Sequence, residues 1–186
     1  MRVTIAEKIF HQTPQQIRQE LQQGKSGDLT RRRLIILLSL IGLAAMTMVS
    51  LFQTGLIHHI PDLPNRALFD SAKVNSSEQA YKFGLPDGPF VMVSLAITIV
   101  LAAFGGANRA EVHLWIPLVF TAKTAVDAFF SAAYLWNMIT VQKVACIYCI
   151  AAALATFAIV ALTLPETKRA MIYVKLNHRA PVQTHA

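Results

Sequence analysis

The two cysteines of the chain stand three residues apart, in the segment Cys146-Ile147-Tyr148-Cys149. Residues with this spacing lie on one face of a helix and are close enough to form a disulfide. The segment opens a long apolar stretch, and the N-terminus of a helix carries a partial positive charge, which favours thiolate over thiol. We therefore predict thiol–disulfide chemistry at Cys146 and Cys149. The alternative is that they are two small buried residues without a chemical role.

A lysine and an aspartate form the second candidate pair. Lys123 and Asp127 are four residues apart in an otherwise uncharged apolar stretch, so they share one helical face and can pair. Charges within a membrane span are rare, and they usually face protein or water. Two interpretations stay open: an ion pair that fixes one helix against its neighbours, or a carboxylate at Asp127 that exchanges protons with a substrate. Ser94 and Thr98 could add hydroxyl groups to this site.

Four apolar segments must position these side chains. The chain has a mean hydropathy of +0.46 and is 54% hydrophobic, which is too apolar for an ordinary soluble fold. The predicted spans, each near the roughly 20 residues that cross a membrane as a helix, are 34–57, 88–108, 113–138 and 144–165. We predict an all-α membrane protein with a bundle of four transmembrane helices. The buried core of a soluble helical protein is the alternative, and soluble helices normally show a polar stripe.

The basic residues predict how the chain is oriented. Seven Lys or Arg residues precede the first span, one separates the second from the third, and four follow the last, whereas the two opposite loops carry four in total. The positive-inside rule then places residues 1–33 and 166–186 in the cytoplasm and the loop 58–87 on the other side. The net charge of +7 is thus explained by topology. Because no basic patch is interleaved with aromatic residues, we expect membrane lipid and no nucleic acid as a partner.

Neither the first 33 residues nor the pair His58-His59 carries predicted chemistry. Thr13 and Pro14 are typical of a helix start, and Gly24 predicts the end of that N-terminal helix. His58 and His59 have no further ligands nearby at a recognised spacing, so no metal site is predicted.

Four spans, a long loop after the first, and a CxxC motif at the start of the fourth resemble the vitamin K epoxide reductase (VKOR) family. The loop adds to this resemblance. Family members carry a cysteine, a valine three residues later, a hydroxyl pair and then a Phe-Gly or similar pair. The segment 71–77, Ser-Ala-Lys-Val-Asn-Ser-Ser, and the pair Phe83-Gly84 fit that frame. The resemblance covers about residues 34–165.

The resemblance implies a function and roles for Cys146, Cys149 and Ser77, beside those that their place in the span predicts for Lys123 and Asp127. Family members pass electrons from protein thiols to a quinone. Cys149 would be the deeper thiol that faces the quinone, and Cys146 the outer thiol that exchanges with a thioredoxin-like thiol donor. Ser77 would lie in the loop that covers the site. Ser77 and Lys123 are the residues expected to contact the quinone, which would be of the ubiquinone or menaquinone type, and Asp127 is expected to supply protons.

The chain departs from the family pattern at two places. The shuttle cysteines of the loop are missing, and Ser71 stands where one belongs; Ala153 replaces a tyrosine that vertebrate members carry. We expect a quinone-linked thiol–disulfide oxidoreductase that supports disulfide formation outside the cytoplasm, in a bacterial inner (plasma) membrane. The alternatives are a redox-inactive member that binds a quinone or a protein partner, and a redox sensor whose CxxC motif changes state without turnover.

Overall fold

The computed structural model describes residues 14–64, 68–106 and 108–179, and most of these residues lie in helices. An isolated bridge between Phe69 and Ala145 is the sole β-type pairing in these residues. The elements, in chain order, are α2 (Pro14–Gln53), α3 (Ser71–Asn75), the 3-10 helix η1 (Glu78–Gly84), α4 (Asp87–Ala103), α5 (Arg109–Val112), α6 (Trp115–Asn137), the π-helix η2 (Met138–Gln142) and α7 (Ile147–Arg179).

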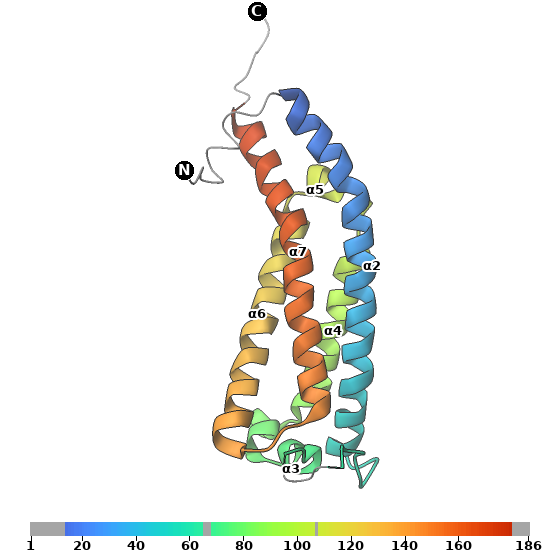
Figure 1. The fold of residues 1–186 in the computed structure, drawn as a ribbon, viewed down its shortest axis with the longest axis vertical. Coiled ribbons are helices and arrows are strands. Elements are labelled where there is room, and N and C mark those ends of the chain that lie inside the picture. Colours follow the sequence, from blue (N-terminus) through green and yellow to red (C-terminus); the bar gives the residue numbers. More distant parts are fainter. Residues whose placement is uncertain (1–13, 65–67, 107, 180–186) are drawn as a thin grey trace, which may run out of the picture.

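Helices α2, α4, α6 and α7 run side by side along the long axis of the molecule (Figure 1). Helix α2 packs closely against α4 and α7, and α7 packs closely against α6, whereas α4 and α6 touch much less. The start of α2 and the end of α7 lie at one end of the bundle, and α3 lies at the other (Figure 1). The bundle is therefore closed on three sides and loosely closed between α4 and α6.

The outer surface of the bundle is apolar. Leu37, Phe129 and Trp136 are 54%, 69% and 71% exposed, which would be unfavourable in water over so wide a surface and is favourable in lipid. Three helical segments are long and apolar enough to cross a membrane, and α4 is a shorter apolar helix of 17 residues. The three segments are Gly27–Gln53, Trp115–Gln142 and Ile147–Lys175. The chain is an all-α membrane protein, as predicted.

Two helices extend beyond the spans that the sequence predicts. The prediction that Gly24 ends the N-terminal helix is wrong, because α2 runs without a break from Pro14 to Gln53. A glycine inside a helix costs only about 1 kcal/mol, which is too little to stop a helix that continues into an apolar span. Helix α7 likewise passes through Pro165 and ends at Arg179, so no break in the helix separates the fourth span from the tail.

A buried ion cluster joins four helices at the end of the bundle where α2 starts. The Glu166 carboxylate on α7 accepts hydrogen bonds from Arg32 on α2 (2.6 Å) and from Arg109 on α5 (2.6 and 2.8 Å). The Arg109 guanidinium also donates to the carbonyl oxygens of Leu101 and Phe104 at the C-terminus of α4. Both arginines count as topology signals in the sequence, which does not predict this contact. The contact holds α2, α4, α5 and α7 together.

Candidate functional site

The two thiols meet at the start of α7, at the end of the bundle near α3. Cys146 immediately precedes the helix and is fully buried, and Cys149, in the first turn, is 8% exposed. The two Sγ atoms are 2.7 Å apart, and the Cys149 N–H donates to the Cys146 Sγ atom at 3.2 Å. Both cysteines are free. A disulfide bond, at about 2.05 Å, requires only a small approach of the two atoms.

The loop after α2 covers Cys146. Backbone hydrogen bonds link Asp70 N–H to the Ala145 carbonyl (3.1 Å) and Ala145 N–H to the Leu68 carbonyl (2.8 Å). The Tyr148 hydroxyl donates to the Pro61 carbonyl at 2.8 Å. These contacts fasten the loop to the segment that carries the CxxC motif, so the loop must move before a large molecule can reach Cys146.

Hydrogen bonds around Cys146 favour its thiolate. The largest effect is the hydrogen bond from the Cys149 thiol. Burial opposes it, and hydrogen bonds from the Cys149 backbone and the Asn75 side chain add to it. Together they lower the pKa of the Cys146 thiol from 9.0 to about 7. Cys146 is therefore the more acidic thiol at the entrance to the helix, as expected for a thiol that exchanges with a partner.

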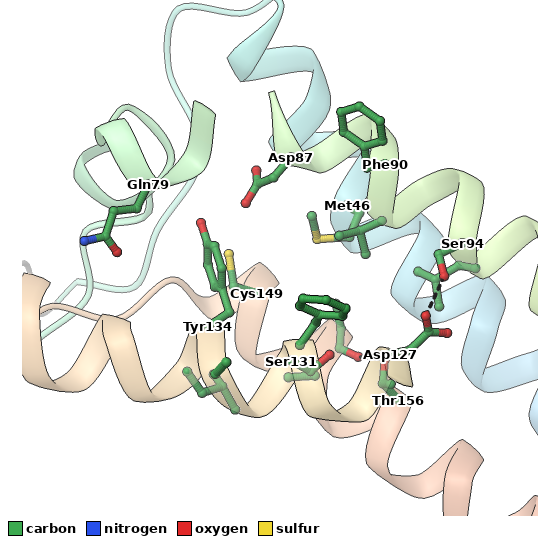
Figure 2. A pocket seen from close by; sticks show the side chains of 17 residues that line it. Met46, Gln79, Asp87, Phe90, Ser94, Asp127, Ser131, Tyr134, Cys149 and Thr156 are labelled. Atoms are coloured by element: carbon green, nitrogen blue, oxygen red, sulfur yellow. Dashed lines mark hydrogen bonds between the residues drawn. The ribbon is translucent and has the colours of Figure 1, made fainter. Parts of the chain in front are cut away.

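Cys149 faces the other way, into a cavity of about 300 Å³. Figure 2 shows its sulfur beside the ring of Tyr134, with Met46, Phe90 and Thr156 on the surrounding walls. The walls are mostly apolar, and their polar groups come from seven residues with side-chain oxygen or amide groups and from one thiol. The polar lining residues are Gln79, Asp87, Ser94, Asp127, Ser131, Tyr134, Thr156 and Cys149.

The predicted Lys123–Asp127 pair is present. The Lys123 ammonium lies 2.6 Å from the Asp127 carboxylate, and Ser94 donates to the same carboxylate at 2.9 Å. Lys123 also donates to the Ser94 carbonyl (2.6 Å) and to the Thr98 hydroxyl (2.5 Å). Asp127 lines the cavity, whereas Lys123 does not. Lys123 thus contacts the site through Asp127.

The sequence matches the vitamin K epoxide reductase family over residues 33–164. The chain belongs to this family. The match covers most of the chain and every residue that lines the cavity, and it confirms the resemblance carried by the CxxC motif and the loop. No curated protein and no solved structure matches the chain significantly. Membership supports a redox-related function at a membrane, and VKOR family proteins generally use a quinone as electron partner and pair with thioredoxin-like proteins.

The structure places both residues that depart from the VKOR pattern, Ser71 and Ala153, near the thiols or the cavity. Ser71, at the place of a shuttle cysteine, is fully buried, and its backbone N–H and hydroxyl both donate to the Asp62 carboxylate. Ala153 lines the cavity without a polar group, and Tyr134 of α6 brings a hydroxyl to the same cavity. That hydroxyl is buried, has no hydrogen-bond partner among the described residues, and points toward Asp87 (Figure 2).

Asp87 lines the cavity and was not predicted as a site residue. Asp87 begins α4 and accepts a hydrogen bond from the Gln53 amide at 2.6 Å, while the Gly88 N–H donates to the Gln53 amide oxygen at 3.0 Å. A Cβ atom at Gly88 would lie 2.7 Å from Gln53 and Ser50 atoms, so glycine permits α2 and α4 to approach here. The signal that was available is an acidic residue in the first turn of an apolar helix.

Ser77 does not line the cavity. Its hydroxyl donates to the Val74 carbonyl at 2.7 Å and accepts a hydrogen bond from the Gln142 amide at 3.1 Å. Gln79, two residues later, is the loop residue that reaches the cavity (Figure 2). Ser77 therefore fastens the loop to the π-helix before the CxxC motif. Among the described residues, no three His, Cys, Asp or Glu side chains group as metal ligands.

Proposed function

We propose that this protein is a quinone-linked membrane thiol–disulfide oxidoreductase that supports disulfide formation outside the cytoplasm. The observation that carries the proposal is the division of the CxxC motif. Cys149 lies in the wall of an apolar cavity, and Cys146 lies outside that cavity beneath a loop. One thiol can therefore react with a small molecule from the membrane while the other exchanges with a protein.

The position of the cavity supports a hydrophobic substrate. The cavity is lined by residues of both α4 and α6, the two neighbouring helices that touch least. Phe90 on α4 and Phe130 on α6 line it and are 59% and 63% exposed. A quinone ring on an isoprenoid tail can enter here from the lipid without crossing water, and mostly apolar walls with a few placed polar groups are typical of such sites.

The exchange steps follow from the two thiols. A thiolate of the partner dithiol attacks Cys146 in the Cys146–Cys149 disulfide, which forms a mixed disulfide and releases Cys149. The second thiol of the partner then attacks the partner's other sulfur atom, which is bonded to Cys146 in the mixed disulfide. This step forms the partner's disulfide and releases Cys146 as a thiolate. The partner loses two electrons and gains a disulfide, and the CxxC motif holds both electrons. The loop over Cys146 moves aside for these steps.

The cavity residues would serve the second half of the cycle. A quinone supplies an acceptor for two electrons and takes up two protons. Cys149, in the cavity wall, would deliver the electrons while the Cys146–Cys149 disulfide reforms. Asp127, held by Lys123 and Ser94, would provide a proton at one end of the cavity, and the Tyr134 hydroxyl a hydrogen bond at the other.

We propose that the CxxC end of the bundle lies outside the cytoplasm, in a bacterial inner membrane. Both the start of α2 and the end of α7 lie at the opposite end (Figure 1), and most of the basic residues flank that end. The positive-inside rule favours the cytoplasm for it. Disulfides persist on the outer side, where the thiols would act.

A mixed-disulfide trap tests the proposal. A soluble thioredoxin-like protein that keeps only its attacking cysteine, activated as a mixed disulfide with thionitrobenzoate, should remain attached through Cys146 of the Cys149→Ala variant. Cys146 displaces thionitrobenzoate, and neither protein then holds a second thiol that can break the new bond. Cys146→Ala is the matched control and should trap nothing. A trap formed only by Cys146→Ala, through Cys149, would reverse the assignment of the two thiols.

A redox-inactive protein that binds a quinone is the second candidate. It is favoured by the full burial of Cys146 and by the serine at position 71, since no loop cysteine can relay electrons there. Such a protein would bind a quinone analogue with the same affinity in the wild type and in the Cys146→Ala variant, and would form no trapped species in either cysteine variant.

A further inference from the structure

One buried amide contacts both thiols. Asn75, the last residue of α3, is fully buried. Its amide nitrogen lies 3.3 Å from the Cys146 Sγ atom, and its amide oxygen lies 3.7 Å from the Cys149 Sγ atom. A buried asparagine costs free energy unless its amide groups are hydrogen-bonded, so packing alone does not explain an asparagine beside two sulfur atoms.

The direction of the amide is fixed by a third contact. The Asn75 nitrogen also donates to the Ser71 carbonyl oxygen at 2.7 Å. A carbonyl oxygen can only accept, so the amide atom that faces it must be the nitrogen. The same nitrogen is thereby directed at Cys146, and the amide oxygen is left for Cys149. Ser71 is itself held by the Asp62 carboxylate, and Asp70 caps the other end of α3.

An amide distinguishes a thiolate from a thiol. An N–H group stabilises a sulfur that accepts, as a thiolate does, and a carbonyl oxygen stabilises a sulfur that donates, as a thiol does. We propose that Asn75 is a positioning residue for thiol exchange, whose N–H holds Cys146 as the thiolate in the reduced protein, while the Cys149 thiol donates its hydrogen to Cys146. This inference rests on the proposed function and specifies how its two thiols are assigned.

The assignment favours one step of the exchange. When the partner's second thiol completes the partner disulfide, the bond between Cys146 and the partner breaks and Cys146 leaves as a thiolate. A thiolate leaves faster when the pKa of its thiol is lower. The Asn75 amide exchanges no proton in this step; its N–H donates a hydrogen bond that stabilises the Cys146 thiolate as it leaves. Cys149 keeps one of the two protons of the partner dithiol, and the other goes to solvent.

Other ionisable groups surround the pair without supplying this hydrogen bond. On the loop, Asp62 binds Ser71 and Asp70 binds the Lys73 N–H. The remaining groups near the two sulfur atoms are Asp87 on α4, Tyr134 on α6 and Tyr148 on α7, while Lys73 and Lys143 are exposed. The carboxylates would disfavour a thiolate. Among the described residues, Asn75 and Ser71 are the side chains other than Cys149 that hydrogen-bond to Cys146, and the Ser71 hydroxyl is already donated to the Asp62 carboxylate.

Two variants of the full-length protein in detergent test the inference. Asn75→Leu keeps the approximate volume and removes the donor, and Asn75→Asp keeps the shape and adds a negative charge. The first readout is the pH dependence of Cys146 alkylation by iodoacetamide, with a midpoint near the thiol pKa of about 7 in the unmutated protein. The second is the equilibrium of the CxxC motif with reduced and oxidised glutathione at pH 7.

Both variants should move the alkylation midpoint upward and shift the glutathione equilibrium toward the disulfide by about tenfold, since a hydrogen bond to a charged group is lost. Asn75→Asp should move both further than Asn75→Leu. Asn108→Asp, an exposed position outside the thiol site, is the matched control and should change neither. Circular dichroism shows whether each variant is folded. If Asn75→Leu is unfolded, the result for Asn75→Asp tests the inference.

An unchanged midpoint and an unchanged equilibrium in a folded variant would overturn the inference and leave Asn75 a packing residue. Neither readout contains a quinone. If the unmutated protein reduces no quinone while both readouts respond to Asn75, the proposed function fails and the thiol assignment stands. If it reduces a quinone and neither readout responds, only the role of Asn75 is lost.

Discussion

The Lys123–Asp127 pair should be strongly coupled, and the coupling can be measured by a double-mutant cycle. Lys123→Met strands the Asp127 carboxylate with the Ser94 hydroxyl as its described hydrogen-bond donor. Asp127→Leu leaves the Lys123 ammonium with two acceptors, the Ser94 carbonyl and the Thr98 hydroxyl. The lysine replacement should therefore cost more stability than the aspartate replacement. The double variant leaves no charge in the span and should cost little more than Asp127→Leu.

The magnitudes follow from depth and exposure. A lone charge at mid-membrane costs about 2.5–3.5 kcal/mol on insertion scales. The side chains of Lys123 and Asp127 are 20% and 26% exposed, which relieves part of that cost. We expect about 2 kcal/mol for Lys123→Met and about 1 kcal/mol each for Asp127→Leu and the double variant, which is a coupling of about 2 kcal/mol.

The assay is reversible unfolding in mixed detergent micelles, followed by the far-ultraviolet circular dichroism of the helices. Phe129→Leu, at a side chain that is 69% exposed on the outer surface of α6, is the control and should add independently to Lys123→Met. Additive effects of Lys123→Met and Asp127→Leu would show that the two charges do not interact, and would refute the reasoning.

Three further outcomes are expected. Glu166→Gln should lower the free energy of unfolding by about 3–5 kcal/mol, because it leaves two buried guanidinium groups without their carboxylate, whereas Glu78→Gln, at an exposed position, should have no measurable effect. Asp127→Asn should slow quinone reduction by about a hundredfold or more and leave exchange at Cys146 nearly intact; equal loss in both half-reactions would point to a structural pair. A reporter inserted near Gln79 should be outside the cytoplasm, and a cytoplasmic signal there would reverse the proposed orientation.

Features that depend on spacing along one helix could be predicted from the sequence. Cys146 and Cys149 are three residues apart, and Lys123 and Asp127 are four apart, so helical geometry alone brings each pair together. The apolar segments are long enough to identify a membrane protein on composition. The CxxC motif and the loop frame identified the family, which the match over residues 33–164 confirms.

Features that depend on how helices meet could not be predicted. Arg32 and Arg109 lie 134 and 57 residues from Glu166 along the chain, so no local sequence pattern connects them. Asn75 lies in the loop segment 71–77 and has no role there that the sequence predicts; the packing of α3 onto the start of α7 brings it to the thiols. Tyr134 is typical of a membrane interface, and its direction into the cavity depends on the rotation of α6.

Single-turnover quinone reduction tests the central claim most directly. The purified protein is reduced with dithiothreitol, freed of excess reductant and mixed without oxygen with a ubiquinone or menaquinone analogue. Absorbance reports the hydroquinone, and mass spectrometry after alkylation reports the state of Cys146 and Cys149. We predict that each protein molecule forms one hydroquinone and one Cys146–Cys149 disulfide, and that Cys149→Ala forms neither. Two free thiols and no hydroquinone after mixing, with a quinone analogue shown to bind, would contradict the proposed function.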